Sequence, residues 1–148
     1  MTESQVTPLA RRVDVRGPKF GAAVTTVVLV VVLATGSGWL LAAQAAVFAI
    51  GAGAGLRYAP YGLLFSRLVR PRLGPPPAFE DEVPPRFAQG VGVLFALVGA
   101  VGYLAGAPVV GIVATALALA AAFLNAAFGF CLGCEMYLLL VRLRKRGA

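Results

Sequence analysis

Histidine is absent from this chain of 148 residues, and cysteine, tryptophan and acidic residues are scarce. Without histidine the chain lacks the commonest general base and the commonest metal ligand, so a histidine-dependent enzyme is not expected. The two cysteines supply only half of a four-ligand zinc site. Charged residues make up 13% of the chain, with six acids against thirteen bases, so few positions are available for ionic chemistry.

Apolar residues are abundant instead: they make up 59% of the chain, and the mean hydropathy is +0.86. They are also segregated, because no charged residue occurs from Phe20 to Leu56 or from Phe87 to Cys134. A membrane-spanning helix needs about 20 predominantly apolar residues, so each tract has room for two spans. The composition therefore predicts an all-α integral membrane protein. No cleaved signal peptide is expected, because the first apolar run follows a polar stretch and lacks a cleavage-site pattern.

Each tract contains a break at which a helical hairpin would turn. The first break is the Gly-Ser-Gly sequence at 36–38, and the second is Gly-Ala-Pro at 106–108, where proline suits the first turn of a new helix. We therefore predict four spans in a single membrane domain, residues 1–148, at about 20–36, 39–56, 87–104 and 109–130.

The thirteen basic residues fall in three segments that flank the predicted spans. Cells retain basic flanks on the cytoplasmic side, so both termini and the loop 57–86 are predicted to be cytoplasmic in a multi-pass protein of the cell membrane. The formal charge of +7 indicates anionic lipid headgroups as partners. Nucleic acid is not an expected partner, since no recognisable nucleic-acid module accompanies the charge. The basic residues are Arg11, Arg12, Arg16 and Lys19; Arg57, Arg67, Arg70, Arg72 and Arg86; and Arg142, Arg144, Lys145 and Arg146.

The two halves of the chain resemble each other weakly. GPKFG at 17–21 opens the first hairpin and PPRFA at 84–88 the second, while YGLLFSRL follows the second span and YLLLVRL the fourth. The pattern indicates two hairpins in parallel repeat, each followed by a short amphipathic helix in the membrane interface. Chance similarity between membrane hairpins is the alternative. The acids at 80–82 are expected in a solvated loop. The residues expected among lipid headgroups are Arg67, Arg70, Arg72, Arg142, Arg144, Lys145 and Arg146.

Small and polar residues within the spans indicate how the helices pack. Glycines at 90, 92, 99 and 102 on the third span face an alanine-rich fourth span, so these two helices are predicted to pack tightly. Gln44 and Asn125 are amides in apolar surroundings, which makes them candidates for an interhelical hydrogen bond or for a site. The spans contain no ionisable residue that would serve a proton-coupled carrier.

Both cysteines lie in one C-x-x-C motif, Cys131 and Cys134, where the fourth span should leave the bilayer. Gly129 and Gly133 are expected to supply the backbone freedom that lets the two sulfurs meet. If the helix breaks there, Cys134 begins an interfacial helix whose N–H groups favour a thiolate. Inert packing and a metal shared between copies are alternatives. A permanent structural disulfide is not expected on the cytoplasmic side.

The sequence GFCLGC at 129–134, with Tyr137 and with PRFA at 85–88, resembles the family called domain of unknown function 4395. These are small bacterial membrane proteins with a G-F-C-x-G-C-x-x-Y signature, and the resemblance covers about Val13 to Arg142. Family members usually carry a basic residue after the second cysteine, whereas this chain has Glu135. The family has no settled activity. Its genes often lie near those of thioredoxin-like proteins or sulfurtransferases, which implies redox or sulfur handling at the bacterial inner membrane.

We therefore predict a thiol-disulfide or sulfur-relay role for Cys131 and Cys134, in exchange with a thioredoxin-like or sulfurtransferase partner. Two other classes stay open: a non-catalytic assembly or structural subunit, and a small transporter of a sulfur compound, which would need a homo-oligomer to form a pore. No cofactor and no metal is evident, and whether the protein is an enzyme by itself is left open. The supporting residues are Asn125, Gln44, Gly129, Gly133 and Tyr137.

Overall fold

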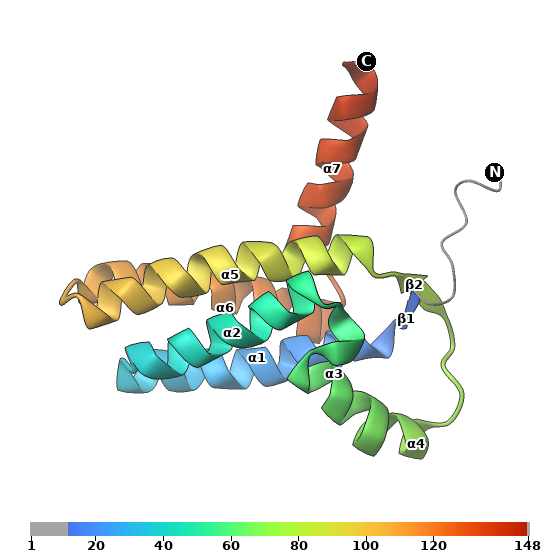
Figure 1. The fold of residues 1–148 in the computed structure, drawn as a ribbon, viewed down its shortest axis with the longest axis horizontal. Helices are drawn as coiled ribbons and strands as arrows, with labels where there is room; N and C mark the ends of the chain where they lie inside the picture. The colour runs from blue at the N-terminus through green and yellow to red at the C-terminus, as the bar shows by residue number, and fades with distance from the viewer. Residues whose placement is uncertain (1–11, 148) are drawn as a thin grey trace.

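The computed structural model describes residues 12–147, which are almost entirely helical; Arg11, one of the predicted cytoplasmic bases, lies outside them. Four helices lie side by side along one axis: α1 (Arg16–Thr35), α2 (Gly38–Gly53), α5 (Val83–Leu104) and α6 (Pro108–Phe128) (Figure 1). Among the described residues, α1, α5 and α6 are long and apolar enough to cross a membrane. The fourth bundle helix, α2, is apolar but has only 16 residues.

The two hairpins of the bundle pack extensively on each other, and α1 and α2 make little contact with one another. α2 packs chiefly against α5, and α1 against α6, while α5 and α6 also pack on each other. Each half of the chain therefore buries its apolar surface against the other half, and the two halves form one body. The central core is made of Leu29, Val32, Leu41, Ala45, Phe48, Ala96 and Ala100.

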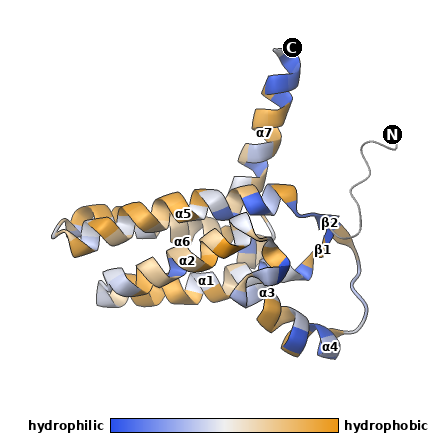
Figure 2. Ribbon diagram, in the orientation of Figure 1, coloured by the Kyte–Doolittle hydropathy of each residue, from blue (hydrophilic) through white to orange (hydrophobic). Residues whose placement is uncertain are grey.

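Large apolar side chains also cover the outside of the bundle. Val27, Leu94, Val101 and Val109 are each exposed by 62–71%. Figure 2 shows hydrophobic residues along the length of the bundle and hydrophilic residues gathered at the end where β1, β2, α4 and α7 lie. An apolar surface of this extent suits lipid hydrocarbon rather than water, and we conclude that this is a membrane protein.

Both tight turns of the bundle fall at the breaks in the two charge-free tracts. Gly36 ends α1 with a φ of 66° and donates its N–H to the Val32 carbonyl. Ser37 then caps α2 by accepting the Leu40 N–H at 3.1 Å. At the second turn Gly106 has a φ of 84°, and Pro108 stands in the first turn of α6. These residues occupy the positions where glycine, serine and proline are most favourable.

Two glycines of α5 permit its close packing on neighbouring helices. A Cβ at Gly102 would lie 2.8 Å from the Gly111 backbone nitrogen of α6, which leaves no room for a methyl group. A Cβ at Gly99 would lie 2.7 Å from the Leu41 Cδ2 of α2 and 3.3 Å from the Ala114 Cβ of α6, so this glycine faces both helices. Gly92 instead faces Phe48 of α2, and Gly90 meets no described atom within 4 Å.

Two helical segments leave the bundle at its hydrophilic end. After the single turn η3 (Leu56–Tyr58), the first segment comprises α3 (Pro60–Leu64), the π-helical turn η4 (Phe65–Val69) and α4 (Arg70–Leu73). The second is α7 (Leu132–Arg146), which projects steeply away from the bundle axis (Figure 1). A two-stranded antiparallel ribbon, β1 (Arg12–Asp14) with β2 (Phe79–Asp81), joins the chain segments before α1 and α5. The sequence predicted a solvated loop for residues 80–82; Glu80 and Asp81 are exposed as predicted, but they pair in β2 rather than in a loop, and Glu82 is buried.

The two segments make similar contacts with the first helix of their own half. Phe65 of η4 lies against Phe20 of α1, with ring centroids 5.7 Å apart, and Tyr137 of α7 lies against Phe87 of α5 at 5.6 Å. Aromatic pairs at this separation add to the energy of apolar burial. An aromatic pair therefore anchors each segment at the hydrophilic end of the bundle.

Candidate functional site

The site begins where α6 ends. Gly129 adopts a φ of 68° and donates its N–H to the Asn125 carbonyl at 2.9 Å, and the Phe130 N–H reaches back to the Leu124 carbonyl at 3.2 Å. This left-handed glycine termination satisfies carbonyl groups that the helix end would otherwise leave unpaired. Gly129 thus supplies the predicted backbone freedom, and the chain changes direction immediately before the first cysteine.

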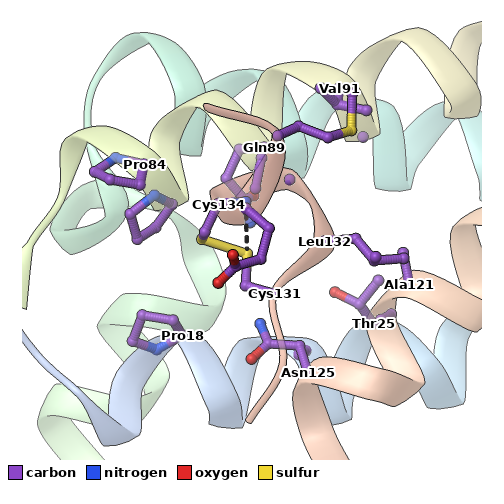
Figure 3. A pocket seen from close by; sticks show the side chains of 18 of the residues that line it. Pro18, Thr25, Pro84, Gln89, Val91, Ala121, Asn125, Cys131, Leu132 and Cys134 are labelled. Carbon is purple, nitrogen blue, oxygen red and sulfur yellow. Dashed lines mark hydrogen bonds between the residues drawn. A yellow bond between two sulfur atoms is a disulfide. The ribbon is translucent and has the colours of Figure 1, made fainter. Parts of the chain in front are cut away.

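Cys131 and Cys134 form a disulfide, with their Cα atoms 5.2 Å apart. Cys131 is in an extended conformation as the N-cap of α7, and its Sγ accepts the Cys134 backbone N–H at 3.2 Å (Figure 3). The sequence placed the start of this helix at Cys134, whereas α7 begins at Leu132, so the Cys131 sulfur lies at the N-cap and accepts one of the free N–H groups of the first turn. Both cysteines are partly buried.

Gly133 has a different role from the one predicted. It is not among the described glycines with positive φ, so it gives the motif no special backbone freedom. A Cβ at this position would lie 2.6 Å from the Ala88 Cα of α5. Gly133 therefore allows α7 to touch the α5 backbone, and the ring of Tyr137 packed on Phe87 holds the same two helices together one turn later.

A cavity of about 750 Å³ lies beside the disulfide, between α1, α5, α6 and α7. Both cysteines line it. Its deep end reaches Phe48, Phe95 and Leu117 in the middle of the bundle. Small side chains leave the space open, because each occupies far less volume than a leucine would. These small residues are Ala22, Ala88, Gly92, Ala118, Ala121 and Ala122.

Polar groups concentrate on the part of the cavity nearest the cysteines. Asn125 lies one helical turn before the end of α6, and its amide points toward Cys131 (Figure 3). Thr25 and Gln89 contribute further hydrogen-bonding groups from α1 and α5. Glu80 lines the outer part, where partial desolvation raises the pKa of its carboxyl group. The cavity is thus polar at its outer end and apolar at depth.

The second predicted amide, Gln44, lies elsewhere. It is only 1% exposed, and its Oε1 accepts the hydroxyl of Tyr61 in α3 at 2.6 Å. Burial raises the pKa of Tyr61, so the phenol stays protonated and donates. The Nε2 atom of Gln44 has no hydrogen-bond partner among the described residues. Gln44 is not part of the cavity wall, so the structure does not bring Gln44 and Asn125 into one site.

The predicted headgroup residues are exposed on the two projecting segments, with one exception. The guanidinium of Arg70 is 3.8 Å from the buried Asp14 carboxylate and lies 5.9 Å from the centre of the Phe79 ring. Asp14 also binds Arg16 at 2.8 Å, and this hydrogen-bonded guanidinium lowers the pKa of the Asp14 carboxyl group. Arg70 therefore links η4 and α4 to the ribbon. The exposed residues are Arg67, Arg72, Arg142, Arg144, Lys145 and Arg146.

Sequence reasoning missed the structural role of Arg86. Its Nε donates to the Ala52 carbonyl at 3.0 Å, its Nη2 to the Gly53 carbonyl at 2.8 Å, and its Nη1 lies 3.5 Å from Glu82. A positive charge at the carboxyl end of α2 stabilises the helix dipole and satisfies two terminal carbonyls. The only sequence signal was a single base at the start of a charge-free tract.

The arrangement favours thiol chemistry over metal chemistry. Within residues 12–147, no group of three or more histidine, cysteine, aspartate or glutamate side chains is placed to hold a metal ion. A partly buried disulfide at a helix N-terminus can instead be opened by a thiolate, because the N–H groups stabilise the sulfur that becomes an anion.

Comparison with known proteins identifies the family but supplies no activity. No curated protein and no solved structure matches the chain. The model of the family described as "Domain of unknown function (DUF4395)" matches residues 13–142. The chain therefore belongs to the DUF4395 family.

Proposed function

We propose that the protein is a membrane thiol-disulfide exchange protein whose Cys131 and Cys134 cycle between dithiol and disulfide. The observation that carries this proposal is the disulfide at the start of α7, lying between a helix N-terminus and a large cavity. Cysteines that served only to fill space would not need one sulfur to act as the N-cap of a helix. The proposal concerns this chain alone, because its family has no assigned chemistry.

We propose different roles for the two sulfurs, on the basis of their positions at the start of α7. In the dithiol form, the N–H groups of the first turn of α7 stabilise a Cys131 thiolate, so Cys131 attacks first. Its attack on a partner disulfide forms a mixed disulfide and releases one partner thiolate. The Cys134 thiolate then attacks the Cys131 sulfur, which closes the internal disulfide and releases the second partner thiolate. The partner gains two electrons, and the pair loses two.

A soluble partner of the thioredoxin or sulfurtransferase type fits this chemistry. The cysteines stand at the start of α7, which leaves the bundle at its hydrophilic end (Figure 2), where a soluble protein can approach. The second candidate is sulfur relay, in which Cys131 receives a sulfane sulfur as a persulfide and attack by an acceptor thiol passes it on. Exchange of a disulfide is favoured here, because the second sulfur lies close enough to close the bridge.

For the membrane topology, we propose four spans: the three long helices α1, α5 and α6, and the shorter helix α2. The hydrophilic end, including both projecting segments, then faces the cytoplasm of a bacterial inner membrane, with basic side chains among anionic headgroups. The matched pairs Phe20 with Phe65 and Phe87 with Tyr137 support a parallel repeat of two hairpins with interfacial segments. α2 is about 24 Å long at 1.5 Å per residue, and a short span of this kind crosses where the bilayer thins or neighbouring helices cover it.

The test is covalent trapping of the partner in cells. A Cys134→Ser variant keeps the attacking sulfur and lacks the resolving one, so it should accumulate mixed disulfides that reductant releases. Cys131→Ser is the matched control, and it should trap much less. If neither single variant traps a partner, and the wild-type pair does not change its redox state when cells are exposed to dithiothreitol and then to oxidant, the exchange proposal is wrong.

Two further measurements separate the alternatives. A structural or assembly subunit would keep all its interactions in a Cys131→Ala, Cys134→Ala double variant. A transporter of a sulfur compound would show flux in liposomes that does not depend on cycling of the pair. Either result, together with an unreactive cysteine pair, would replace the exchange proposal.

A further inference from the structure

We infer that the cavity beside the disulfide binds a lipophilic quinone, which takes up the electrons of the reduced cysteine pair. This inference rests on the proposed exchange function and names its second substrate. Thiol-disulfide exchange is reversible, so a soluble dithiol can also reduce the Cys131–Cys134 disulfide, and the reduced pair must then pass the two electrons on before it can react again. The cavity offers a site for a second reactant at the same two sulfurs.

The size and position of the cavity fit a ring compound that enters from lipid. Its volume of about 750 Å³ is within the range of small-molecule sites. Its wall runs from Pro84 to Phe95 of α5, which is about 17 Å along the helix axis at 1.5 Å per residue. It therefore extends from the hydrophilic end to the level of the apolar bundle surface. A lipid-soluble molecule can reach this depth, whereas a polar oxidant would have to leave water.

The chemistry of the wall favours a quinone over a simple acyl chain. A quinone has an apolar ring with two carbonyl oxygens, and these need hydrogen-bond donors as they are reduced. The Asn125 amide, which points toward Cys131, and the Thr25 hydroxyl lie near each other on the cavity wall and are suitable donors (Figure 3). An acyl chain would leave these polar groups unpaired. The small residues nearby leave room for a flat ring.

The reaction balances without another reactant. The two thiols of Cys131 and Cys134 lose two electrons and two protons and form the disulfide. The quinone accepts the same two electrons and two protons at its oxygens and becomes the hydroquinone. Carbonyl oxygens gain the protons, and hydrogen bonds from the wall stabilise the negative charge that forms before protonation.

The experiment uses the full-length protein in lipid nanodiscs, reduced with dithiothreitol that is then removed. A ubiquinone analogue with a ten-carbon tail is added without oxygen. The recovery of disulfide is followed by maleimide mass-tagging, and the hydroquinone is measured by its absorbance. We expect one hydroquinone for each disulfide formed, with saturation as the quinone concentration rises. No reoxidation, or reoxidation that increases linearly with quinone without saturating, overturns the inference.

A matched pair of variants tests the location of the site. Ala121→Phe fills the cavity, whereas Ala120→Phe adds the same ring at an exposed position on the same helix that does not line it. Saturable reoxidation should be lost in the first variant and kept in the second. Asn125→Leu should raise the quinone concentration needed for half-saturation by about two- to tenfold, which corresponds to the loss of one hydrogen bond. Equal behaviour of the two phenylalanine variants would overturn the assigned site.

Failure of this inference can be distinguished from failure of the exchange function. In a separate assay, the reduced pair is incubated with the disulfide form of a soluble thioredoxin-type protein, and the oxidised pair with its dithiol form. Exchange with that protein, combined with no quinone-driven oxidation, leaves the proposed function standing and removes the quinone. An Ala121→Phe variant that still exchanges with the soluble protein shows that the variant is folded. Failure of both reactions removes the exchange function itself.

Discussion

Replacement of Gly133 by alanine tests whether the contact between α7 and α5 positions the disulfide. The new Cβ would lie 2.6 Å from the Ala88 Cα, a distance that side-chain rotation cannot relieve because the neighbouring atom belongs to the backbone. Overpacking of this kind costs about 1–3 kcal/mol. Gly90→Ala is the matched control, because its Cβ meets no described atom within 4 Å and alanine gains up to about 1 kcal/mol in a helix.

The two variants should therefore differ by about 1–4 kcal/mol in the free energy of unfolding. For a chain of this length the difference corresponds to a Tm about 2–16 °C lower for Gly133→Ala than for Gly90→Ala. Thermal unfolding in detergent measures it, and alkylation of the reduced protein shows whether Cys131 and Cys134 become more accessible as α7 moves. If Gly133→Ala unfolds at the same temperature as the control and its cysteines react unchanged, the close contact is not what positions the site.

Three further changes test other parts of the structure. Tyr61→Phe should lower stability by about 1–3 kcal/mol, since it leaves the Gln44 amide buried without a partner, and the Tyr61→Phe, Gln44→Leu double variant should recover most of this loss in thermal unfolding. Asp14→Asn should lower the Tm near neutral pH but not in strong acid. The paired guanidinium lowers the Asp14 pKa from 3.8, so its stabilising effect is present above that pH and is lost as the pH falls through the folded-state pKa. Arg86→Ala should cost about 1–3 kcal/mol in the same assay by leaving two α2 carbonyls unpaired, and lysine should restore part of it; an unchanged Tm would contradict the capping role.

The sequence carries clear signals for the helices and for the corner at the cysteines. Charge-free tracts interrupted by glycine and proline specify where the bundle turns, because these residues have strong backbone preferences. Gly129 likewise ends α6 immediately before Cys131, and this termination places the motif at the start of a helix. These features depend on residues close to one another in the chain.

Other features depend on residues far apart and could not be predicted. The cavity exists because small side chains from three helices face one another, and no local pattern shows which alanines do so. The role of Gly133 depends on its distance from Ala88, and the role of Arg86 on the end of α2. The ribbon of residues 12–14 with 79–81 is too short to show an alternating pattern, and its two strands are separated in the chain by all the helices from α1 to α4.

A redox titration of the cysteine pair tests the central proposal most directly. The full-length protein in native membranes is equilibrated with glutathione buffers of defined potential, and free thiols are tagged with a maleimide of known mass. We predict one reversible two-electron transition of Cys131 and Cys134 with a midpoint between about −300 and −120 mV, the range of exchange-active pairs. A pair that remains dithiol, or remains disulfide, across that whole range would contradict the account.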